Sequence, residues 1–352
     1  MRVTNNMMVA NTVWNINKNM ERLNKASQVS STQSKIQLPS DDPIIATRAV
    51  KYRSYVANVE QYQKNVESAV SWQEVTNSAL DGLTDVVQRL QELVTQASSD
   101  VLNDSNLADI KSEVLQLQQT AIDYLNTSYA GRYVFAGYDT DEPPYSLETV
   151  TIGSTEVSMV NFKGNTLTAT VDASVDDADI TDYYTNNAAY TDTGSDQKIF
   201  YNVGFGTSLA VNVEGQDVTG SGAGNLFDTI SKILIGLDGG DSYKTAATDP
   251  ATGAVTIATT GFAMDDFLTD LSGNLNTILT AQTDLGARMK YAEMAQSRLA
   301  SNLETYTALM SNNEDADIAL ASTDLTTAQS VYNASLSVGS IVMSKSLVDF
   351  LR

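Results

Sequence analysis

The chain has 352 residues, of which 43 are acidic and 21 are basic, and its formal net charge is −22. This acidity argues against nonspecific nucleic-acid binding, which depends mainly on a positive surface. The sequence contains neither cysteine nor histidine, so disulfides, thiolate metal sites and histidine-based catalytic sites are excluded. No apolar run approaches the roughly 20 residues that a membrane-spanning helix needs, and we expect no membrane partner.

Charge is distributed unevenly, which predicts more than one structural region. Residues 1–60 carry eight basic and four acidic side chains, whereas residues 139–250 carry four basic and eighteen acidic ones. The N-terminal stretch MRVTNNMMVANTVWN lacks the apolar core and the cleavage site of a secretory signal. If the protein leaves the cell, we expect it to use a route without a cleaved signal peptide.

The N-terminal region is predicted to be helical, with one interruption at the sequence LPSDDP. Proline disfavours helical geometry in the residue before it, so Asp42 should lie outside the following helix. The Asp42 carboxylate can then cap the free amides of that helix, and Pro43 fits the first helical position. Before the interruption, five apolar residues recur at helical spacing: Val9, Val13, Ile16, Met20 and Leu23.

Three longer stretches show apolar residues in alternating steps of three and four, the heptad pattern of helices packed lengthwise. The first runs from Pro43 to about Asp100, and the second follows the turn sequence SSDVLNDSN from Leu107 to Ser128. The third predicts a helix over about 264–312. These patterns have no partner of comparable size except one another, so we predict a mainly α, elongated helical bundle formed by both ends of the chain.

The middle of the chain is predicted to be an insert domain that is mostly β, with an α+β character. Apolar and polar residues alternate in ETVTIGSTEVSMV, TLTATVDA, SLAVNVEG and AVTIATT, whereas NLFDTISKILIGL fits one short amphipathic helix. We therefore expect five segments. They are an N-terminal assembly segment (1–42), two halves of a helical rod (43–139 and 263–312), the insert (140–262) and a C-terminal assembly helix (313–352).

The C-terminal stretch VYNASLSVGSIVMSKSLVDFLR has apolar residues on two opposite faces of a helix. The N-terminal helix can cover one face. The second face is either buried in the chain's own bundle or covered by neighbouring copies or a related subunit, and in the latter case both chain ends are disordered in the monomer. The predicted interface residues on this helix are Val331, Val338, Ile341, Val342 and Val348 on one face, and Leu336, Met343, Leu347 and Phe350 on the other.

No motif in the sequence indicates catalysis, a cofactor or a metal. The segment GSGAGN has Asn225 where a dinucleotide-binding motif has its third glycine. The segment DASVDDADITD, residues 172–182, lacks the ligand spacing and central glycine of an EF-hand, and we expect a solvated acidic loop there. We therefore predict a protein that is not an enzyme and that has no cofactor and no metal site.

Several motifs together resemble the flagellin family. NNEDADIALASTDLTTAQ, residues 312–329, is similar to the Glu-Asp-Ala-Asp segment of that family, and VDFLR is similar to its Leu-Arg ending. PSDDP at 39–43 and GRYVFAGYDTDEPPY at 131–145 resemble the hook–filament junction members of the family more than its filament-forming members, although Tyr145 stands where those members often have Phe. The resemblance covers about 1–145 and 262–352 and is weak over 146–261.

The resemblance implies a structural adaptor that polymerises with copies of itself at the hook–filament junction and connects hook-associated protein 1 to flagellin. It also implies unfolded export by the flagellar type III apparatus with an export chaperone, and an extracellular location in the bacterial flagellum. Two alternatives remain open at this point. One is a flagellin that forms the filament itself, and the other is a surface adhesin or enzyme displayed through the insert.

Overall fold

The computed structural model describes residues 5–98, 104–187, 197–222, 224–248 and 254–350. The chain forms two compact units, one made of Met1–Gln61 with Arg298–Arg352 and the other of Tyr62–Ser297. Both boundaries lie inside long helices, because α2 (Pro43–Ala97) and α7 (Met264–Glu314) each contribute to both units. None of the described helices has the combination of length and apolar character that crossing a membrane requires.

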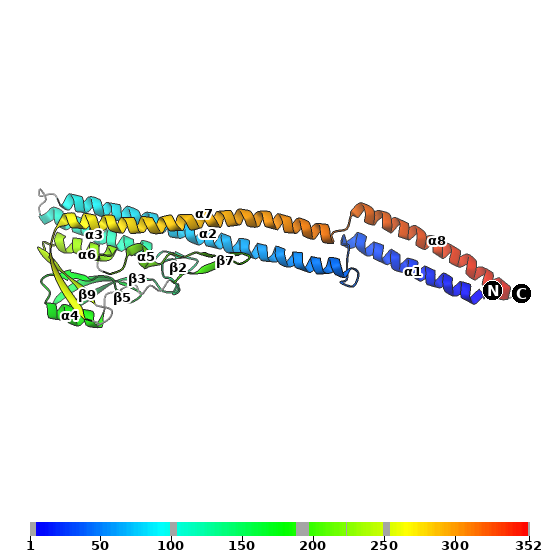
Figure 1. The fold of residues 1–352 in the computed structure, drawn as a ribbon, viewed down its shortest axis with the longest axis horizontal. Helices are drawn as coiled ribbons and strands as arrows, with labels where there is room; N and C mark the ends of the chain where they lie inside the picture. Colours follow the sequence, from blue (N-terminus) through cyan, green and yellow to red (C-terminus); the bar gives the residue numbers. More distant parts are fainter. Residues whose placement is uncertain (1–4, 99–103, 188–196, 223, 249–253, 351–352) are drawn as a thin grey trace. The chain divides into compact units, whose positions relative to one another are not determined.

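The first unit is built from the two ends of the chain. Helix α1 (Asn5–Thr32) and helix α8 (Ile318–Phe350) lie side by side, with the chain termini at the same end of the pair (Figure 1). The remainder of this unit is the beginning of α2 and the end of α7. There the ring of Tyr55 packs on the ring of Tyr306, with 5.2 Å between the ring centroids. The prediction that both chain ends form helices that pack together is confirmed.

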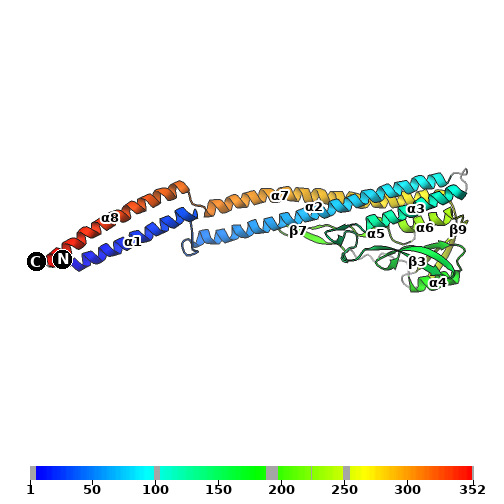
Figure 2. The same ribbon diagram turned by 180° about the vertical axis from the view of Figure 1, so that it is seen from behind.

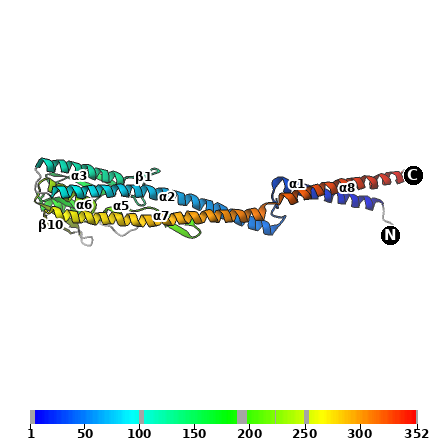
Figure 3. The same ribbon diagram turned by 90° about the horizontal axis from the view of Figure 1, so that it is seen from above.

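The second unit has a helical part made of α2, α3 (Asp104–Leu125) and α7, which run alongside one another (Figure 3). Arg89 of α2 forms an ion pair with Glu113 of α3, with 2.7 Å between Nε and Oε1. Gln91 of α2 donates a hydrogen bond to Ser272 of α7. The heptad pattern of α2 is buried along this part of the helix: Val66, Ala69, Gln73, Thr76, Leu80, Leu83, Val87, Leu90 and Val94.

The β-rich part of the second unit lies along one side of these helices (Figure 2). It contains two antiparallel three-stranded sheets, in the strand orders β3-β4-β5 and β10-β9-β6, and two antiparallel hairpins, β1-β2 and β7-β8. This confirms the predicted β-rich centre of the chain. The strands are β1 (Ser128–Tyr129), β2 (Arg132–Tyr133), β3 (Tyr145–Ile152), β4 (Thr155–Phe162), β5 (Asn165–Thr166), β6 (Thr170–Asp172), β7 (Phe200–Gly204), β8 (Thr207–Ala210), β9 (Ser242–Thr248) and β10 (Val255–Gly261).

Three short helices complete this part: α4 (Asp177–Asn186), α5 (Gly215–Thr219) and α6 (Leu226–Leu237). Helix α6 was expected, and its N-cap Asn225 accepts a hydrogen bond from the Asp228 amide. The prediction of an acidic loop over 172–182 was wrong, because α4 begins inside this segment. Ile180 and Tyr184 of α4 are fully buried in the core of the insert, which explains why these residues become helical.

Candidate assembly interface

The contact between α1 and α8 is a narrow seam that includes many small residues. Gly339 of α8 lies against Ile16 of α1, and a Cβ atom at this glycine would stand 2.9 Å from Ile16 Cδ1. The half-buried or buried residues of both helices recur in steps of three and four. On α1 they include Val9, Thr12, Ile16, Asn19, Leu23, Ala26 and Ser30, and on α8 they are Ala321, Leu325, Ala328, Tyr332, Ser335, Gly339 and Val342.

The residues that the sequence indicated as an assembly interface fall into two groups. Val9, Ile16, Leu23 and Val342 are half-buried on the seam. Six others keep 43–58% of their surface exposed, and they are Val13, Met20, Val331, Leu336, Val338 and Ile341. The side chains of Met343, Leu347, Val348 and Phe350 lie outside the described residues.

The exposed apolar residues of α8 lie on both flanks of the seam. At about 100° per residue, Leu320, Val331 and Val338 share one flank, whereas Ile318 and Leu336 share the other. The seam itself passes between the two apolar faces that the sequence pattern distinguished. The pair of helices therefore leaves apolar surface uncovered in two directions.

Sequence reasoning missed several exposed apolar residues of this pair. Trp14 of α1 is 63% exposed, and Met7, Met8, Ile318 and Leu320 are also exposed. Trp14 lies off the stripe of Val9, Val13 and Ile16, so a search for one periodic face does not find it. A large apolar side chain such as tryptophan on the otherwise polar side of a predicted helix is the signal that could have indicated this exposed residue.

Two chain segments interrupt the helices: residues 33–42 between α1 and α2, and residues 315–317 between α7 and α8. They contact each other where α1 ends and α8 begins. Ser34 pairs with Asp315 in an antiparallel bridge. The Lys35 amide donates to the Glu314 carbonyl at 2.7 Å, and the Ala316 amide donates to the Gln33 carbonyl at 2.7 Å. We call this bridge, made of residues 33–35 and 314–316, together with Arg53, the clasp.

An ion pair between Arg53 and Glu314 closes the clasp. The Glu314 side chain is only 11% exposed, while that of Arg53 is 66% exposed. Arg53 Nε lies 3.1 Å from both carboxylate oxygens, and Nη2 donates to Oε2 as well. Such a forked contact to a carboxylate is among the stronger side-chain hydrogen bonds, and it ties the beginning of α2 to the end of α7.

Aspartates organise both chain segments that leave the clasp. Asp42 Oδ1 accepts hydrogen bonds from the Ile44 and Ile45 amides at 2.9 and 3.1 Å, and α2 begins at Pro43. Asp317 does the same for α8 through the Ala319 and Leu320 amides, at 2.9 and 3.3 Å. Each helix that follows an interruption thus starts with an aspartate at its N-cap.

Asp41, unlike its neighbour Asp42, closes the turn between α1 and α2. Its carboxylate accepts hydrogen bonds from the Leu38 and Gln37 amides, at 3.1 and 3.2 Å. These two amides lower the pKa of the Asp41 carboxyl below its ordinary value, and the ammonium of Lys25, 3.6 Å away, acts in the same direction. The turn therefore contains a carboxylate that stays ionised.

The sequence GRYVFAG, residues 131–137, joins the helical part of the second unit to its β-rich part. Phe135 is buried, and its carbonyl accepts a hydrogen bond from the Gly215 amide at 3.0 Å. Gly137 has a φ of +65°, and a Cβ there would stand 2.5 Å from Oε1 of Gln197. This motif therefore has a structural task, since only glycine fits at its end.

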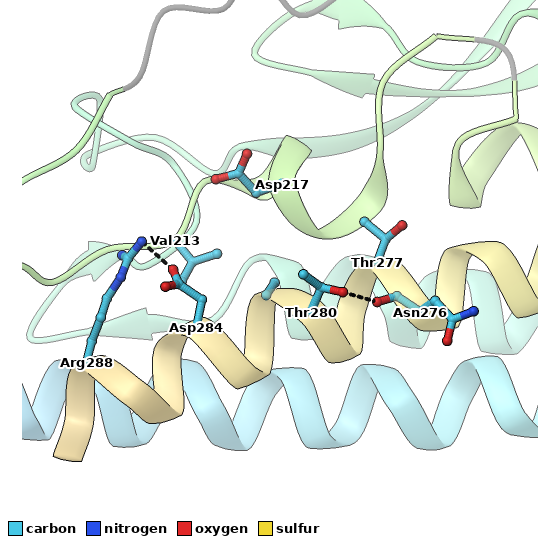
Figure 4. A pocket seen from close by; sticks show the side chains of 8 residues that line it. Val213, Asp217, Asn276, Thr277, Thr280, Asp284 and Arg288 are labelled. Atoms are coloured by element: carbon cyan, nitrogen blue, oxygen red, sulfur yellow. Dashed lines mark hydrogen bonds and ion pairs between the residues drawn. The ribbon is translucent and has the colours of Figure 1, made fainter.

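A cavity of about 490 Å³ lies beside α7 in the second unit (Figure 4). Asp217, Asp284 and Arg288 are among the side chains that line it. Arg288 donates to the Asn212 carbonyl at 3.0 Å, which ties the segment before α5 to α7, and it also pairs with Asp284 on the same helix. We assign the cavity a packing role. Nowhere in the described residues do three acidic side chains gather in a way that could hold a metal ion.

Comparison with known proteins identifies proteins to which this chain is similar. The sequence profile of the bacterial flagellin N-terminal helical region matches residues 3–140. The chain is also 26% identical over 319 residues to flagellar hook-associated protein 3 of Escherichia coli (strain K12), a match that covers 90% of this chain and 89% of that protein. The chain is thus similar to the bacterial flagellin N-terminal helical region over residues 3–140 and to flagellar hook-associated protein 3 over most of its length. The clasp joins the start of the interruption that ends in PSDDP to the Glu-Asp-Ala-Asp segment, two of the motifs on which the resemblance rested.

Other relatives within the flagellin family differ in how much of the chain they match. Flagellar hook-associated protein 3 of Salmonella typhimurium is 27% identical over 238 residues, covering 66% of this chain and 74% of that protein. A flagellin of Escherichia coli O127:H6 is 30% identical, but over 100 residues that cover only 28% of this chain. A solved structure of a flagellar hook-associated protein from Vibrio parahaemolyticus has the same fold, with a TM-score of 0.55 at 14% identity over 78% of this chain.

Proposed function

We propose that this chain is a structural adaptor of the bacterial flagellum, which polymerises at the hook–filament junction and connects hook-associated protein 1 to flagellin. One observation carries the proposal. The α1–α8 pair exposes apolar side chains on both flanks of its seam, in a chain whose similarity to hook-associated protein 3 extends over nine-tenths of its length.

The two flanks suit an assembly of many copies better than a simple dimer. A dimer with two-fold symmetry uses the same patch on both subunits, whereas rings and helical tubes join two different patches. Val338 on one flank and Leu336 on the other provide two such patches on one helix. Large exposed apolar patches on a protein surface typically mark interaction sites. We infer that neighbouring copies cover the exposed residues of α1 and α8.

The proposed function also implies a location for the protein and a route of export. We infer an extracellular location in the flagellum and unfolded export through the type III apparatus with a chaperone. A chain without cysteine suits such a route, because no disulfide has to form or break during export. We propose an architectural task for the chain and no enzymatic activity.

Deletion of the gene tests the proposal directly. Electron microscopy of the deletion strain should reveal hooks without filaments, and its culture medium should contain monomeric flagellin. Expression of the intact gene from a plasmid should restore filaments. Filaments of normal length in the deletion strain would reject the junction function.

The alternative that this chain is itself a filament flagellin has one supporting observation, namely the partial matches to flagellins. Those matches cover 28% and 36% of this chain, and a flagellin of Salmonella paratyphi A matches 68% of it at 24% identity but only 51% of that flagellin. A filament subunit would be the most abundant protein of purified filaments, whereas a junction protein would occur only at their base. Immunogold labelling along the flagellum separates the two functions.

A further inference from the structure

We propose that the clasp sets the register of α1 against α8, and that Arg53 and Glu314 are the positioning residues that keep it closed. The inference rests on the proposed function, because a fixed register matters when every copy must present the same surface to its neighbours. All of the residues involved lie in the first unit.

The seam alone defines the register poorly. Its residues repeat every seven positions, so a shift of one heptad again brings seam residues together. The hollow at Gly339 holds Ile16, and a shift by seven would place Val9 or Leu23 there instead. All three are aliphatic side chains of similar size. The small residues Ala321, Ala328 and Ser335 offer little shape that would reject a shifted helix, and the bulk of the seam on α8 lies in the other heptad row, at Leu325 and Tyr332.

The connection between the helices does not define the register either. A shift by one heptad moves a helix by roughly 10 Å. Ten residues, 33–42, join α1 to α2, and an extended chain of this length spans up to about 33 Å. On the other side, only residues 315–317 join α7 to α8. Helix α8 is therefore placed closely by α7, whereas α1 has enough connecting chain to slide.

The clasp lies on the longer of the two connections, residues 33–42, which would otherwise allow α1 to slide along α8. The bridge between Ser34 and Asp315 begins two residues after the end of α1, so it holds that end at one level beside the start of α8. Lys35 adds a hydrogen bond from Nζ to the Asn312 carbonyl at 2.6 Å. The carbonyl and the carboxylate of Glu314 connect this bridge to Lys35 and Arg53, respectively.

The surroundings of the clasp provide few apolar contacts that could replace these polar ones. Leu38, Ile44, Ile318 and Leu320 flank it, and each is 61–65% exposed. Gln33 adopts a left-handed backbone conformation with a φ of +59°, which opposes closure slightly because it is a non-glycine residue. The polar contacts of Glu314, together with the hydrogen bond that the Asn313 side chain donates to the Ile45 carbonyl, therefore contribute to the closing energy within this unit.

Disulfide trapping in the full-length protein tests the register. The natural chain has no cysteine, so two introduced cysteines report on one contact only. Thr12→Cys with Gly339→Cys reports the observed register, because Thr12 Cγ2 lies 3.7 Å from the position of a Cβ at Gly339. Asn19→Cys with Gly339→Cys reports a shift of one heptad. Oxidation also traps transient pairing, so the chain ends need not be stably paired in the free protein.

The expected products follow from the proposal. In the otherwise natural chain, mass spectrometry of the oxidised monomer should find the 12–339 disulfide in clear excess over the 19–339 disulfide. Arg53→Ala and Glu314→Gln should each shift this ratio about tenfold toward the displaced pair, the scale of a hydrogen-bonded charge pair. Lys51→Ala, which removes an exposed cation two residues away on α2, is the matched control and should leave the ratio unchanged.

A charge exchange distinguishes positioning from a general loss of structure. The double variant Arg53→Glu with Glu314→Arg should restore the original ratio. Equal yields of the two disulfides in the natural background, or a ratio that Arg53→Ala and Glu314→Gln leave unchanged, would overturn the proposal. Either result is independent of the deletion experiment, so a strain with bare hooks and an insensitive ratio would reject the clasp while retaining the junction function.

Discussion

The ring of Tyr124 in α3 lies against Gly82 in α2, where a Cβ atom would stand 2.5 Å from the ring carbon Cζ. The α2–α3 hairpin thus has a close contact at a glycine inside a helix of 55 residues. Glycine in a helix interior costs about 1 kcal/mol of stability relative to alanine. At position 82 it leaves the space that the Tyr124 ring occupies.

Replacement of this glycine should destabilise the second unit. Gly82→Ala should lower the free energy of unfolding by about 1–3 kcal/mol, because the new methyl group displaces the Tyr124 ring. Gly273→Ala in α7 is the matched control, since nothing lies within 4 Å of its Cβ position. Its helix propensity should raise stability by up to about 1 kcal/mol. Urea unfolding followed by circular dichroism measures both, and equal effects would contradict the close approach.

Asp228 should be the most sensitive carboxylate of the insert. It is fully buried and accepts hydrogen bonds from the Ala169 and Gly224 amides, and it pairs with Lys232, which is 8% exposed. Asp228→Ala leaves the lysine with the more distant Asp270 carboxylate and the face of the Tyr243 ring, so we expect a loss of about 3–5 kcal/mol in unfolding free energy.

A surface pair provides the control for Asp228. Asp238 is 69% exposed and pairs with Lys111 at 2.7 Å, so Asp238→Ala should cost no more than about 1 kcal/mol. Urea unfolding monitored by near-ultraviolet circular dichroism compares the two variants. If Asp228→Ala were as mild as Asp238→Ala, the buried pair would not stabilise the insert as described.

A charge on the exposed flank of α8 should block assembly without unfolding the protein. Val338 is 56% exposed, so Val338→Asp should leave the melting temperature of the soluble chain within about 2 °C of the original. Complementation of the deletion strain should fail, because the carboxylate would have to be buried against a neighbouring copy. Ser337→Asp, an adjacent exposed position, is the control. Normal filaments with Val338→Asp would contradict the proposed interface.

The central part of the chain should fold without the α1–α8 pair. A fragment of residues 41–317 retains every element of the second unit, and we expect a soluble, cooperatively folding monomer. In the full chain, fast amide exchange of α1 and α8 before assembly would agree with coverage of these helices by other copies. Strong amide protection of both helices in a dilute monomer would show instead that the pair is stable alone.

Acid should open the turn at Asp41 only at unusually low pH. Its pKa is lowered from 3.8 because the folded turn stabilises the ionised form, so this stabilisation is fully present above the unfolded pKa. It is lost as pH falls through the lowered, folded pKa. The amide proton shifts of Leu38 and Gln37, followed by NMR during acid titration, should change below pH 3.8. A midpoint at or above that value would contradict these hydrogen bonds.

Sequence periodicity predicted the long helices well, because a heptad pattern over many turns leaves few alternatives. The acidic segment before Ile180 was misjudged for a non-local reason. Its helix is held by burial of Ile180 and Tyr184 and by an ion pair from Asp177 to Lys244 of β9, at 2.8 Å. Local composition contains no information on a lysine so far along the chain.

The interface shows a different limit of sequence reasoning. A helical wheel ranks large apolar residues as the contact face, yet α8 meets α1 through Ser335 and Gly339. Small residues permit the close approach and leave Val338 exposed. The clasp could not be predicted at all, since Arg53 and Glu314 lie 261 positions apart and only the fold brings them together.

The pairing of the two chain ends also makes the fold a check on complete synthesis. A product that stops shortly before Arg298 can contain much of the second unit, yet it lacks all of α8 and the C-terminal part of the clasp, residues 314–316. Premature termination or proteolysis of the tail therefore yields a protein with an unpaired N-terminal helix. Such defective copies would be rejected at the growing structure by geometry alone, without a separate protein to inspect them.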